Sequence, residues 1–377
     1  MALRLQRAKH RQYFLISTTS HIDTEEDAEH GNSDPPASEH LAIDWQKLVL
    51  IFLALTAITF TLSRRLLLLP EQSVRVSTAC VETAIRQEWR ALIPTERDDF
   101  VRSVNCLSNT PSRWTHNGSV SDDFAYLHAS IGSWSVERHL TSLIGHRSAA
   151  FLPWHRWTLH QWEKMMRQYC GFSGHVPYWD WTLDWIDLAN SSIWDPDSGF
   201  GSNGIRGGRA SVGNGTCVED GPFADLRPIM YNHTYITHCL SRGFTNNGTS
   251  GGIAGHWYNP EAIGRIMRHE SYKDFVRELE SRLHNTVHPR MGGDFLALTA
   301  ANDPLCFLHH AQLDHIWWRW QQQKPTVRLM AYEGRHMFNS TDENASLQDM
   351  LLFGGFVEDV PVWRAMDSHS EELCYTY

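Results

Sequence analysis

The chain has 377 residues, a formal net charge of −10 at pH 7 and 22 histidines. This length is enough for one sizeable catalytic domain with appendages. The acidic balance and the lack of basic clusters after residue 80 argue against a nucleic acid as partner.

The N-terminal residues are set apart by their composition. Residues 1–44 carry four basic residues before position 12 and eight acidic ones from Asp23 to Asp44, which predicts a disordered tail. An uncharged apolar run then spans 48–63, followed by two arginines and four leucines. We interpret 45–69 as a single transmembrane anchor and 70–79 as a stem. A signal-peptide core and a buried core helix are the alternatives.

The orientation of this anchor is contested within the sequence. Arg64 and Arg65 follow the apolar run and would keep the catalytic part in the cytosol under the positive-inside rule. All glycosylation acceptor sites, however, lie downstream of the run, and six of the seven cysteines (all but Cys306) could form three disulfides. We therefore expect a catalytic domain in the secretory lumen or outside the cell. The pairing is not deducible, although Cys217 with Cys239 would close a short loop. The acceptor sites are Asn117, Asn190, Asn214, Asn232, Asn247, Asn339 and Asn344.

Four stretches have helical patterning and no internal Gly or Pro: 78–89, 154–166, 272–288 and 308–322. The segment 190–255 is rich in Gly, Asn and Ser and predicts loops. The sequence therefore predicts a mainly α domain, in which a central four-helix bundle holds a metal site and long irregular loops surround it. We place this catalytic domain at 80–377. Within it, the aromatic run of Tyr178, Trp179, Trp181 and Trp185 is predicted to belong to the core.

Two groups of histidines dominate the rest of the chain. The first consists of His128, His146 and His155, and the second of His284, His288 and the pair His309-His310. Imidazole nitrogen suits copper and zinc, whereas a di-iron centre would draw Glu ligands and a structural zinc would favour cysteines. His284 and His288 are four residues apart, so on a helix they share one face. Two copper ions are therefore the expected cofactor. We interpret His139, His160, His175, His309 and His315 as ordinary residues.

The same spacing of four separates His310 from Asp314. It would allow the carboxylate to orient a ligand imidazole and fix its tautomer.

At these residues the chain resembles the tyrosinase copper-binding domain family of type 3 copper proteins, from about Cys80 onward. The segment ending in His128 is similar to the family segment that supplies the first ligand. The first-copper signature is matched by His146, Phe151, Leu152, Pro153, Trp154, His155, Arg156 and Glu163. The second-copper signature is matched by Asp303, Pro304, Phe307, His310 and Asp314, with Cys306 where Phe is usual.

The resemblance implies a dinuclear copper centre that activates O2. His128, His146 and His155 would hold one ion and His284, His288 and His310 the other, with His309 set aside. Many fungal relatives carry a thioether-forming cysteine where this chain has Ile144, so no crosslink is expected there. The chain ends soon after Tyr375-Thr-Tyr377, so the long C-terminal extension of latent fungal enzymes is expected to be absent.

The implied reaction is o-hydroxylation of monophenols and oxidation of o-diphenols to o-quinones, in fungal secondary metabolism, on a tyrosine-containing peptide or small phenol. Hydroxylation in the family is assigned to a water held by a Glu and an Asn, which Glu280 and Asn285 resemble. The alternatives are a catechol or o-aminophenol oxidase without the hydroxylation step and a haemocyanin-like O2 carrier. The sequence does not indicate an oligomeric state.

Overall fold

The computed structural model describes residues 46, 52–56, 80, 82–115, 117–132, 145–205, 207–246, 249–250, 252–253, 255–336 and 341–377. The chain divides into two compact units, Met1–Ser73 and Val74–Tyr377. In the first unit, residues 52–56 are helical and exposed. The predicted tail, most of the predicted anchor and the stem lie outside the described residues. Within the part that is described, every helix is too short or too polar to cross a membrane.

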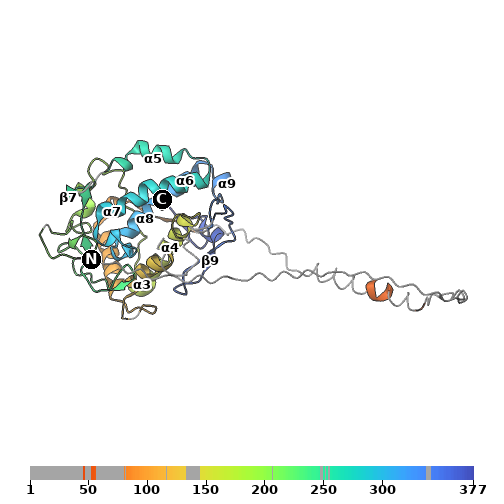
Figure 1. Cartoon of the computed structure of the whole chain (residues 1–377), viewed down its shortest axis with the longest axis horizontal. Coiled ribbons are helices and arrows are strands. Elements are labelled where there is room, and N and C mark those ends of the chain that lie inside the picture. Colours follow the sequence, from red (N-terminus) through yellow and green to blue (C-terminus); the bar gives the residue numbers. More distant parts are fainter. Residues whose placement is uncertain are drawn as a thin grey trace, which may run out of the picture. The chain divides into compact units, whose positions relative to one another are not determined.

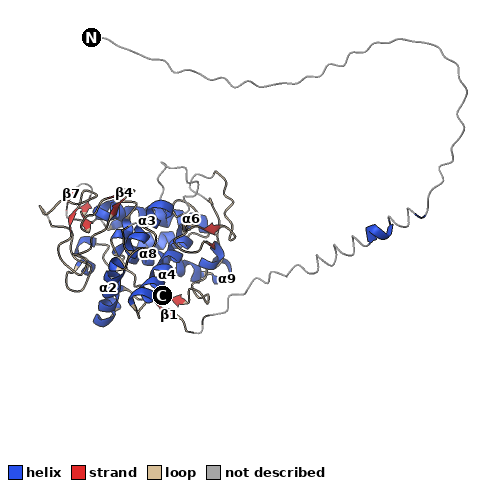
Figure 2. Cartoon of the chain, turned by 90° about the horizontal axis from the view of Figure 1, so that it is seen from below, coloured by secondary structure: helices blue, strands red, loops and turns tan. Residues whose placement is uncertain are grey.

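The second unit is mainly helical, as predicted (Figure 2). Its helices surround the middle of the domain, where α3, α4, α6 and α8 lie near one another (Figure 1). Their bounds are α2 Pro94–Asn109, α3 Val120–Leu127, α4 Phe151–Cys170, α5 Pro260–Met267, α6 Tyr272–Glu278, α7 Asn285–Met291, α8 Leu305–Gln323 and α9 Pro325–Arg328.

In the part of the chain that the structure describes, the strands are all two residues long and form five two-stranded pairs. In the first pair, Ala84 lies opposite Tyr375 in parallel register, and the other four pairs are antiparallel. The pairs are β1 Ala84–Ile85 with β10 Tyr375–Thr376, β2 Thr216–Cys217 with β5 Ser241–Arg242, β3 Met230–Tyr231 with β4 Thr234–Tyr235, β6 Thr245–Asn246 with β7 Thr249–Ser250, and β8 Met350–Leu351 with β9 Val360–Pro361.

Three of the four predicted helices are present. Residues 154–166 lie within α4 and 308–322 within α8. The predicted helix 272–288 is made of α6, a π-helical segment Leu279–His284 and α7. The core is dense in tryptophan, and α4 contacts α8, where Trp162 stacks on Phe307 with ring centroids 3.9 Å apart.

The prediction of a helix at 78–89 is wrong for its described residues, because 82–88 form bends and an extended strand and Trp89–Ala91 a 3₁₀ turn. Tertiary contacts decide this segment. The extended backbone pairs with β10 and carries Arg86 into the interior, where its guanidinium lies 3.7 Å from the centre of the Tyr375 ring. Local helical patterning is a weak preference that such contacts override.

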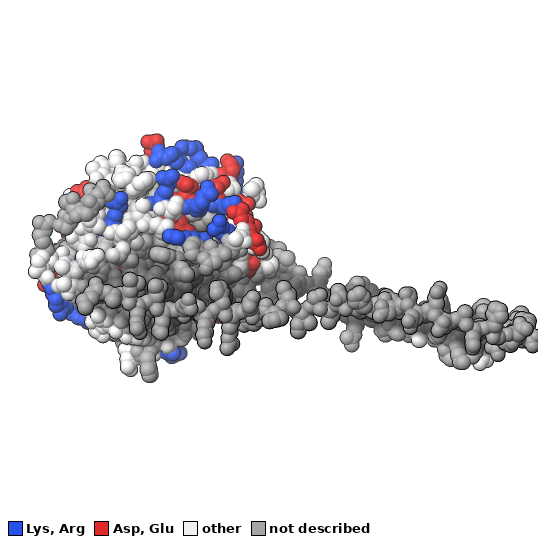
Figure 3. Space-filling view, in the orientation of Figure 1, with Lys and Arg blue, Asp and Glu red and all other residues white. Residues whose placement is uncertain are grey.

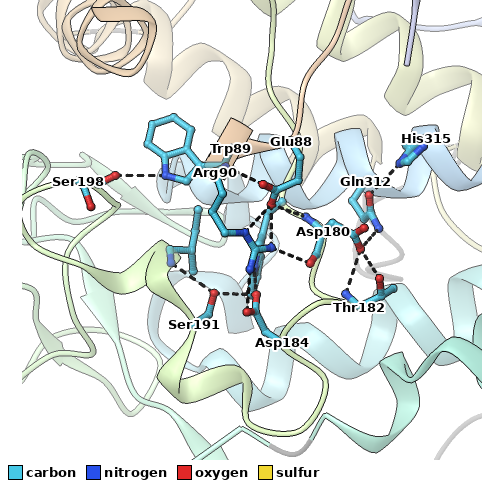
Figure 4. A network of polar contacts seen from close by, with 12 residues as sticks. Glu88, Trp89, Arg90, Asp180, Thr182, Asp184, Ser191, Ser198, Gln312 and His315 are labelled. Carbon is cyan, nitrogen blue, oxygen red and sulfur yellow. Dashed lines mark hydrogen bonds and ion pairs between the residues drawn. The ribbon is translucent and has the colours of Figure 1, made fainter. Parts of the chain in front are cut away.

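A polar network fixes the same segment to the loop after α4 (Figure 4). The Arg90 guanidinium donates to Glu88, to Asp184 at 2.8 Å and to the carbonyl of Asp180 at 2.9 Å. The Asp180 carboxylate in turn accepts from Gln312 of α8 at 2.7 Å. The network therefore joins the N-terminal segment, the loop after α4 and α8, the helix that carries His310.

The aromatic run in this loop is only partly core. Trp179 and Trp181 are fully buried, Tyr178 is half-buried, and Trp185 is 37% exposed. The prediction that the aromatic run belongs to the core is therefore wrong for Trp185.

Two disulfides hold the domain together. Cys106–Cys170 joins α2 to the end of α4, and Cys217–Cys239 closes the short loop that was expected. Cys80 and Cys374 are free thiols. The backbone N–H of Ala84 donates to the carbonyl of Cys374. The structure thus has two of the three disulfides that six cysteines allow.

Candidate metal centre

The six predicted ligand histidines converge on the middle of the domain. His155 comes from α4, His288 from α7 and His310 from α8, while His146 lies in the bend before α4. His128 and His284 lie on π-helical segments, His128–Gly132 and Leu279–His284. Such wide turns in helices occur often at functional sites, because the extra residue reorients the side chains that follow. Five of the six are buried, and His288 is half-buried.

Their nitrogen atoms form two groups. One holds His128, His146, His155 and His310, and the other His284, His288 and His309, with the candidate ligand atoms of each group within 4.8 Å of one another. Proximity alone thus places His309, and not His310, in the second group. The hydrogen bonds of the two rings decide between them.

Four of the ligand rings have a defined tautomer. Because a carbonyl oxygen only accepts, an Nδ1 atom bonded to one must carry the proton, and Nε2 then keeps its lone pair for a metal. The Nδ1–H groups donate over 2.6 to 2.8 Å, His128 to Leu298, His155 to Phe151, His288 to Phe295 and His310 to Cys306.

His309 has the opposite tautomer. The indole N–H of Trp181 donates to its Nδ1 at 3.2 Å. Since an indole nitrogen only donates, this Nδ1 is unprotonated and the neutral ring carries its proton on Nε2. That Nε2 has no lone pair to offer, whereas the Nε2 of His310 does. The tautomers therefore favour His310 as the ligand.

The free nitrogens fit a metal. The Nε2 atoms of His128, His155, His309 and His310 are buried and have no hydrogen-bond partner among the described residues, so only the tautomers separate His309 from His310. The Nε2 atoms of His284 and His288 face each other at 3.0 Å. Buried polar atoms without partners are rare in proteins and require an explanation, and two facing lone pairs repel unless a cation lies beside them.

The charge state of the histidine rings also suits metal binding. Burial lowers the pKa of His128, and burial together with neighbouring imidazoles lowers the pKa of His155, His284 and His310 well below the ordinary value. Burial also lowers the pKa of His288 to about 4. The rings are therefore neutral at pH 7, which is the form that binds metal.

Asp314 does not orient His310, which corrects the expectation from their spacing. One carboxylate oxygen accepts from the Arg156 Nε–H at 2.6 Å, and the other accepts from the hydroxyls of Tyr375 and Tyr377. Asp314 instead ties α4, α8 and the C-terminal strand together. The orienting group for His310 is the backbone carbonyl of Cys306, a buried residue whose side chain is not placed as a ligand.

Glu280 and Asn285 lie beside this cluster. Glu280 is 5% exposed, and burial raises its pKa from the ordinary 4.5 to about 7. Its Oε1 accepts from the backbone N–H of Arg147 at 2.8 Å. The Oδ1 of Asn285 accepts from the Nδ1–H of His284 at 2.9 Å, so Asn285 orients one of the predicted ligands.

A cavity of about 520 Å³ opens onto the histidines. His128, His146, His284 and His288 line it together with Glu280 and Asn285, and apolar groups of Pro289 and Leu296–Leu298 also line it. Its size is typical of a small-molecule site. A planar ring can therefore reach the metal centre and the raised-pKa carboxyl from one cavity.

Sequence reasoning missed the role of Arg147. Its φ of 53° is unusual for a residue other than glycine and directs its N–H toward Glu280. Its position directly after His146 could have drawn attention to it, but no sequence pattern predicts that backbone angle. The carbonyls of Leu298 and Phe295 were likewise not predictable, because any residue supplies one.

Fold and site together define a helical protein that binds transition metal through buried imidazoles. Neither group of candidate ligands in the described part of the chain contains a carboxylate or a thiolate, a donor set that suits copper.

Comparison with known proteins gives the family. Residues 118–323 match the family model "Common central domain of tyrosinase". The chain is 53% identical over 323 residues to Tyrosinase ustQ of Aspergillus flavus, covering 86% of this chain and 87% of that one. It is 55% identical over 298 residues to the tyrosinase-like protein phomQ2 of Diaporthe leptostromiformis, covering 79% and 74%. The fold is similar to a polyphenol oxidase (mutant G292N) of Thermothelomyces thermophila, with TM-score 0.66, 25% identity and 78% and 88% coverage. The chain belongs to the tyrosinase family, and its metal centre is a dinuclear copper site of type 3.

Proposed function

We propose that this copper oxidase hydroxylates monophenols at the ortho position and oxidises o-diphenols to o-quinones with O2. The observation that supports hydroxylation is Glu280, a buried carboxyl in the cavity that the copper ligands line, whose pKa burial raises to about 7 in the metal-free protein. A general base is most effective when its pKa lies near the working pH. In this proposal His128, His146 and His155 hold one copper ion and His284, His288 and His310 the other. The two ions would supply the binding and reduction of O2.

The protein's own groups prepare the phenol. The Arg147 N–H occupies Oε1 of Glu280, which leaves Oε2 to take the phenolic proton, directly or through a water. Asn285 uses its Oδ1 on His284, so its NH2 remains to hold the oxygen of that water. The apolar wall at Leu296–Leu298 provides contact area for the ring and excludes water from it.

Oxygen uptake by the copper-loaded chain tests this proposal. We expect uptake with both a monophenol and the matching o-diphenol, and a Glu280→Gln variant that loses the monophenol reaction more than the diphenol reaction. Glu278→Gln is the matched control, because Glu278 lies on the same helical run but pairs with Arg282. Uptake with the diphenol alone would leave a catechol or o-aminophenol oxidase, and equal losses in both reactions would remove Glu280 from the mechanism.

We further propose that the substrate is a tyrosine-containing peptide or small phenol of fungal secondary metabolism, and that the domain works in the secretory pathway. The fungal relatives support the first part. Two disulfides support the second, since such bonds persist in oxidising compartments. Four acceptor asparagines are also exposed, Asn117, Asn190, Asn214 and Asn344. A mobility shift of the chain from its native host after endoglycosidase treatment would support lumenal placement, and no shift would count against it.

A further inference from the structure

A second cavity of about 430 Å³ adjoins the copper cavity. The two share Arg147, Glu280 and Asn285, so they meet at the carboxyl proposed as the base. The outer cavity contains no copper-ligand histidine. A substrate whose ring lies at the copper site could therefore extend past Glu280 into the outer cavity.

Three segments far apart in the sequence and the single residue Glu343 build this outer cavity; the segments are 147–149 before α4, the run from Lys273 to Asn285, and 333–335. Arg335 is held against the first, because its carbonyl accepts from the N–H of Ala149 at 2.9 Å. Gly334 has a φ of 120°, a backbone conformation in which a side chain would be strained. Glycine therefore permits the turn in 333–335 beside this segment.

The cavity lining carries an excess of cations. Arg147, Lys273, Arg277 and Arg335 contribute four positive charges, against the three carboxylates of Glu280, Glu333 and Glu343. Two of the cations are already engaged, Lys273 with Glu343 and Arg277 with Asp274.

Arg335 is exposed, and no ion pair joins it to an acidic side chain in the described part of the chain. On the face drawn in Figure 3, Lys and Arg side chains are interspersed with Asp and Glu side chains. The Arg335 guanidinium is a planar fork that fits a carboxylate with two parallel hydrogen bonds.

We propose that the outer cavity is a specificity subsite for a carboxylate carried on the substituent of the phenol, with Arg335 as the binding cation. This inference rests on the proposed function, because the ring is assigned to the copper cavity. A carboxylate alone fills little of 430 Å³, so the subsite also has room for the chain that connects it to the ring. A small aromatic acid and a peptide with a free C-terminus share this chemistry.

Calorimetric binding to the copper-loaded full chain tests the subsite with ligands that lack a phenolic hydroxyl and cannot react. The ligands are 3-phenylpropanoate and N-acetyl-Phe-Gly-Gly acid, each compared with its amide. We expect one or both acids to bind about fivefold to tenfold more tightly than the amide, an advantage that shrinks in high salt. The larger acid-over-amide ratio identifies the small acid or the peptide as the source of the carboxylate.

Variants locate the effect. Arg335→Gln should lose most of the acid-over-amide ratio, whereas Arg265→Gln, an exposed arginine of α5 outside the cavity, should keep it. Equal affinities for acid and amide, no binding of either acid, or equal losses in the two variants would overturn the subsite. Failure of the proposed function has a different signature, the absence of oxygen uptake by the wild type with neutral 4-methylcatechol.

Discussion

Replacing Glu280 with Gln should change how the stability of the protein depends on pH. Glu280 is 5% exposed, and burial raises its pKa from 4.5 to about 7. The folded state therefore holds a proton that the unfolded chain releases between these two values, so this residue lowers stability as pH rises from 4.5 to about 7. At 1.36 kcal/mol per pH unit the full effect is about 3 kcal/mol, reached above pH 7, and roughly 2.5 kcal/mol of it falls between pH 5 and pH 8.

Urea unfolding of copper-free wild type and Glu280→Gln, at about pH 5 and about pH 8, measures this effect. Copper is left out because its charge would itself lower the pKa of the carboxyl. The Gln side chain can still accept from the Arg147 N–H, and any fixed cost of the substitution cancels in the comparison across pH. We expect the variant to gain about 2.5 kcal/mol relative to wild type from pH 5 to pH 8. The same pH dependence in both proteins would refute the raised pKa.

The same substitution tests catalysis. If ionised Glu280 takes the phenolic proton, wild-type kcat/KM for a monophenol should rise with pH to a plateau that begins no higher than about pH 7, because copper lowers the pKa of the carboxyl from its metal-free value. Glu280→Gln should lower this value on the order of 100-fold, while diphenol oxidation falls much less. A variant that retains the rise in monophenol activity across neutral pH would remove Glu280 as the base.

Three further substitutions test the surroundings of the metals. His310→Ala should lose bound copper while His309→Ala keeps it, because only His310 presents an unprotonated Nε2; metal analysis after dialysis compares the two. Asn285→Ala should weaken copper binding on the order of tenfold by releasing His284, and Asn285→Asp, which keeps the acceptor oxygen, should restore it in a competition titration with a chelator. Asp314→Asn should lower the free energy of unfolding by about 3 to 5 kcal/mol, because the buried cationic partners of Asp314 would lose its negative charge. The copper content should stay unchanged.

Controls accompany these variants. Asp274→Asn removes one partner of an exposed ion pair with Arg277 and should cost under about 1 kcal/mol. A cost as large as that of Asp314→Asn would contradict the buried role of Asp314. Copper loss in His309→Ala but not in His310→Ala would contradict the tautomer argument, and full copper affinity in Asn285→Ala would show that its contact with His284 is unimportant.

The sequence predicted the helical class and the histidines that gather at the centre, because those residues are chemically distinctive and recur at fixed spacings. It failed at 78–89, where strand pairing with β10 and the burial of Arg86 override a local helical pattern. It also assigned Asp314 to His310 from a spacing of four, although four other side chains, those of Arg86, Arg156, Tyr375 and Tyr377, contact that carboxylate. The groups that fix the imidazole tautomers are mostly backbone carbonyls, and only the folded chain shows which of them lie within reach.

The sequence also did not predict the left-handed backbone at Arg147 or the cavity beyond Glu280. Both depend on how 147–149, α6 and 333–335 meet, and these segments are up to about 190 residues apart in the chain. No local pattern encodes such a meeting.

The most direct test of the account is copper stoichiometry measured together with oxygen uptake on the full chain. We predict two copper ions per chain, and oxygen consumption with an o-diphenol and with the corresponding monophenol only when both ions are bound. One copper ion or none at saturation, or no uptake with the diphenol by the fully loaded chain, would contradict the account.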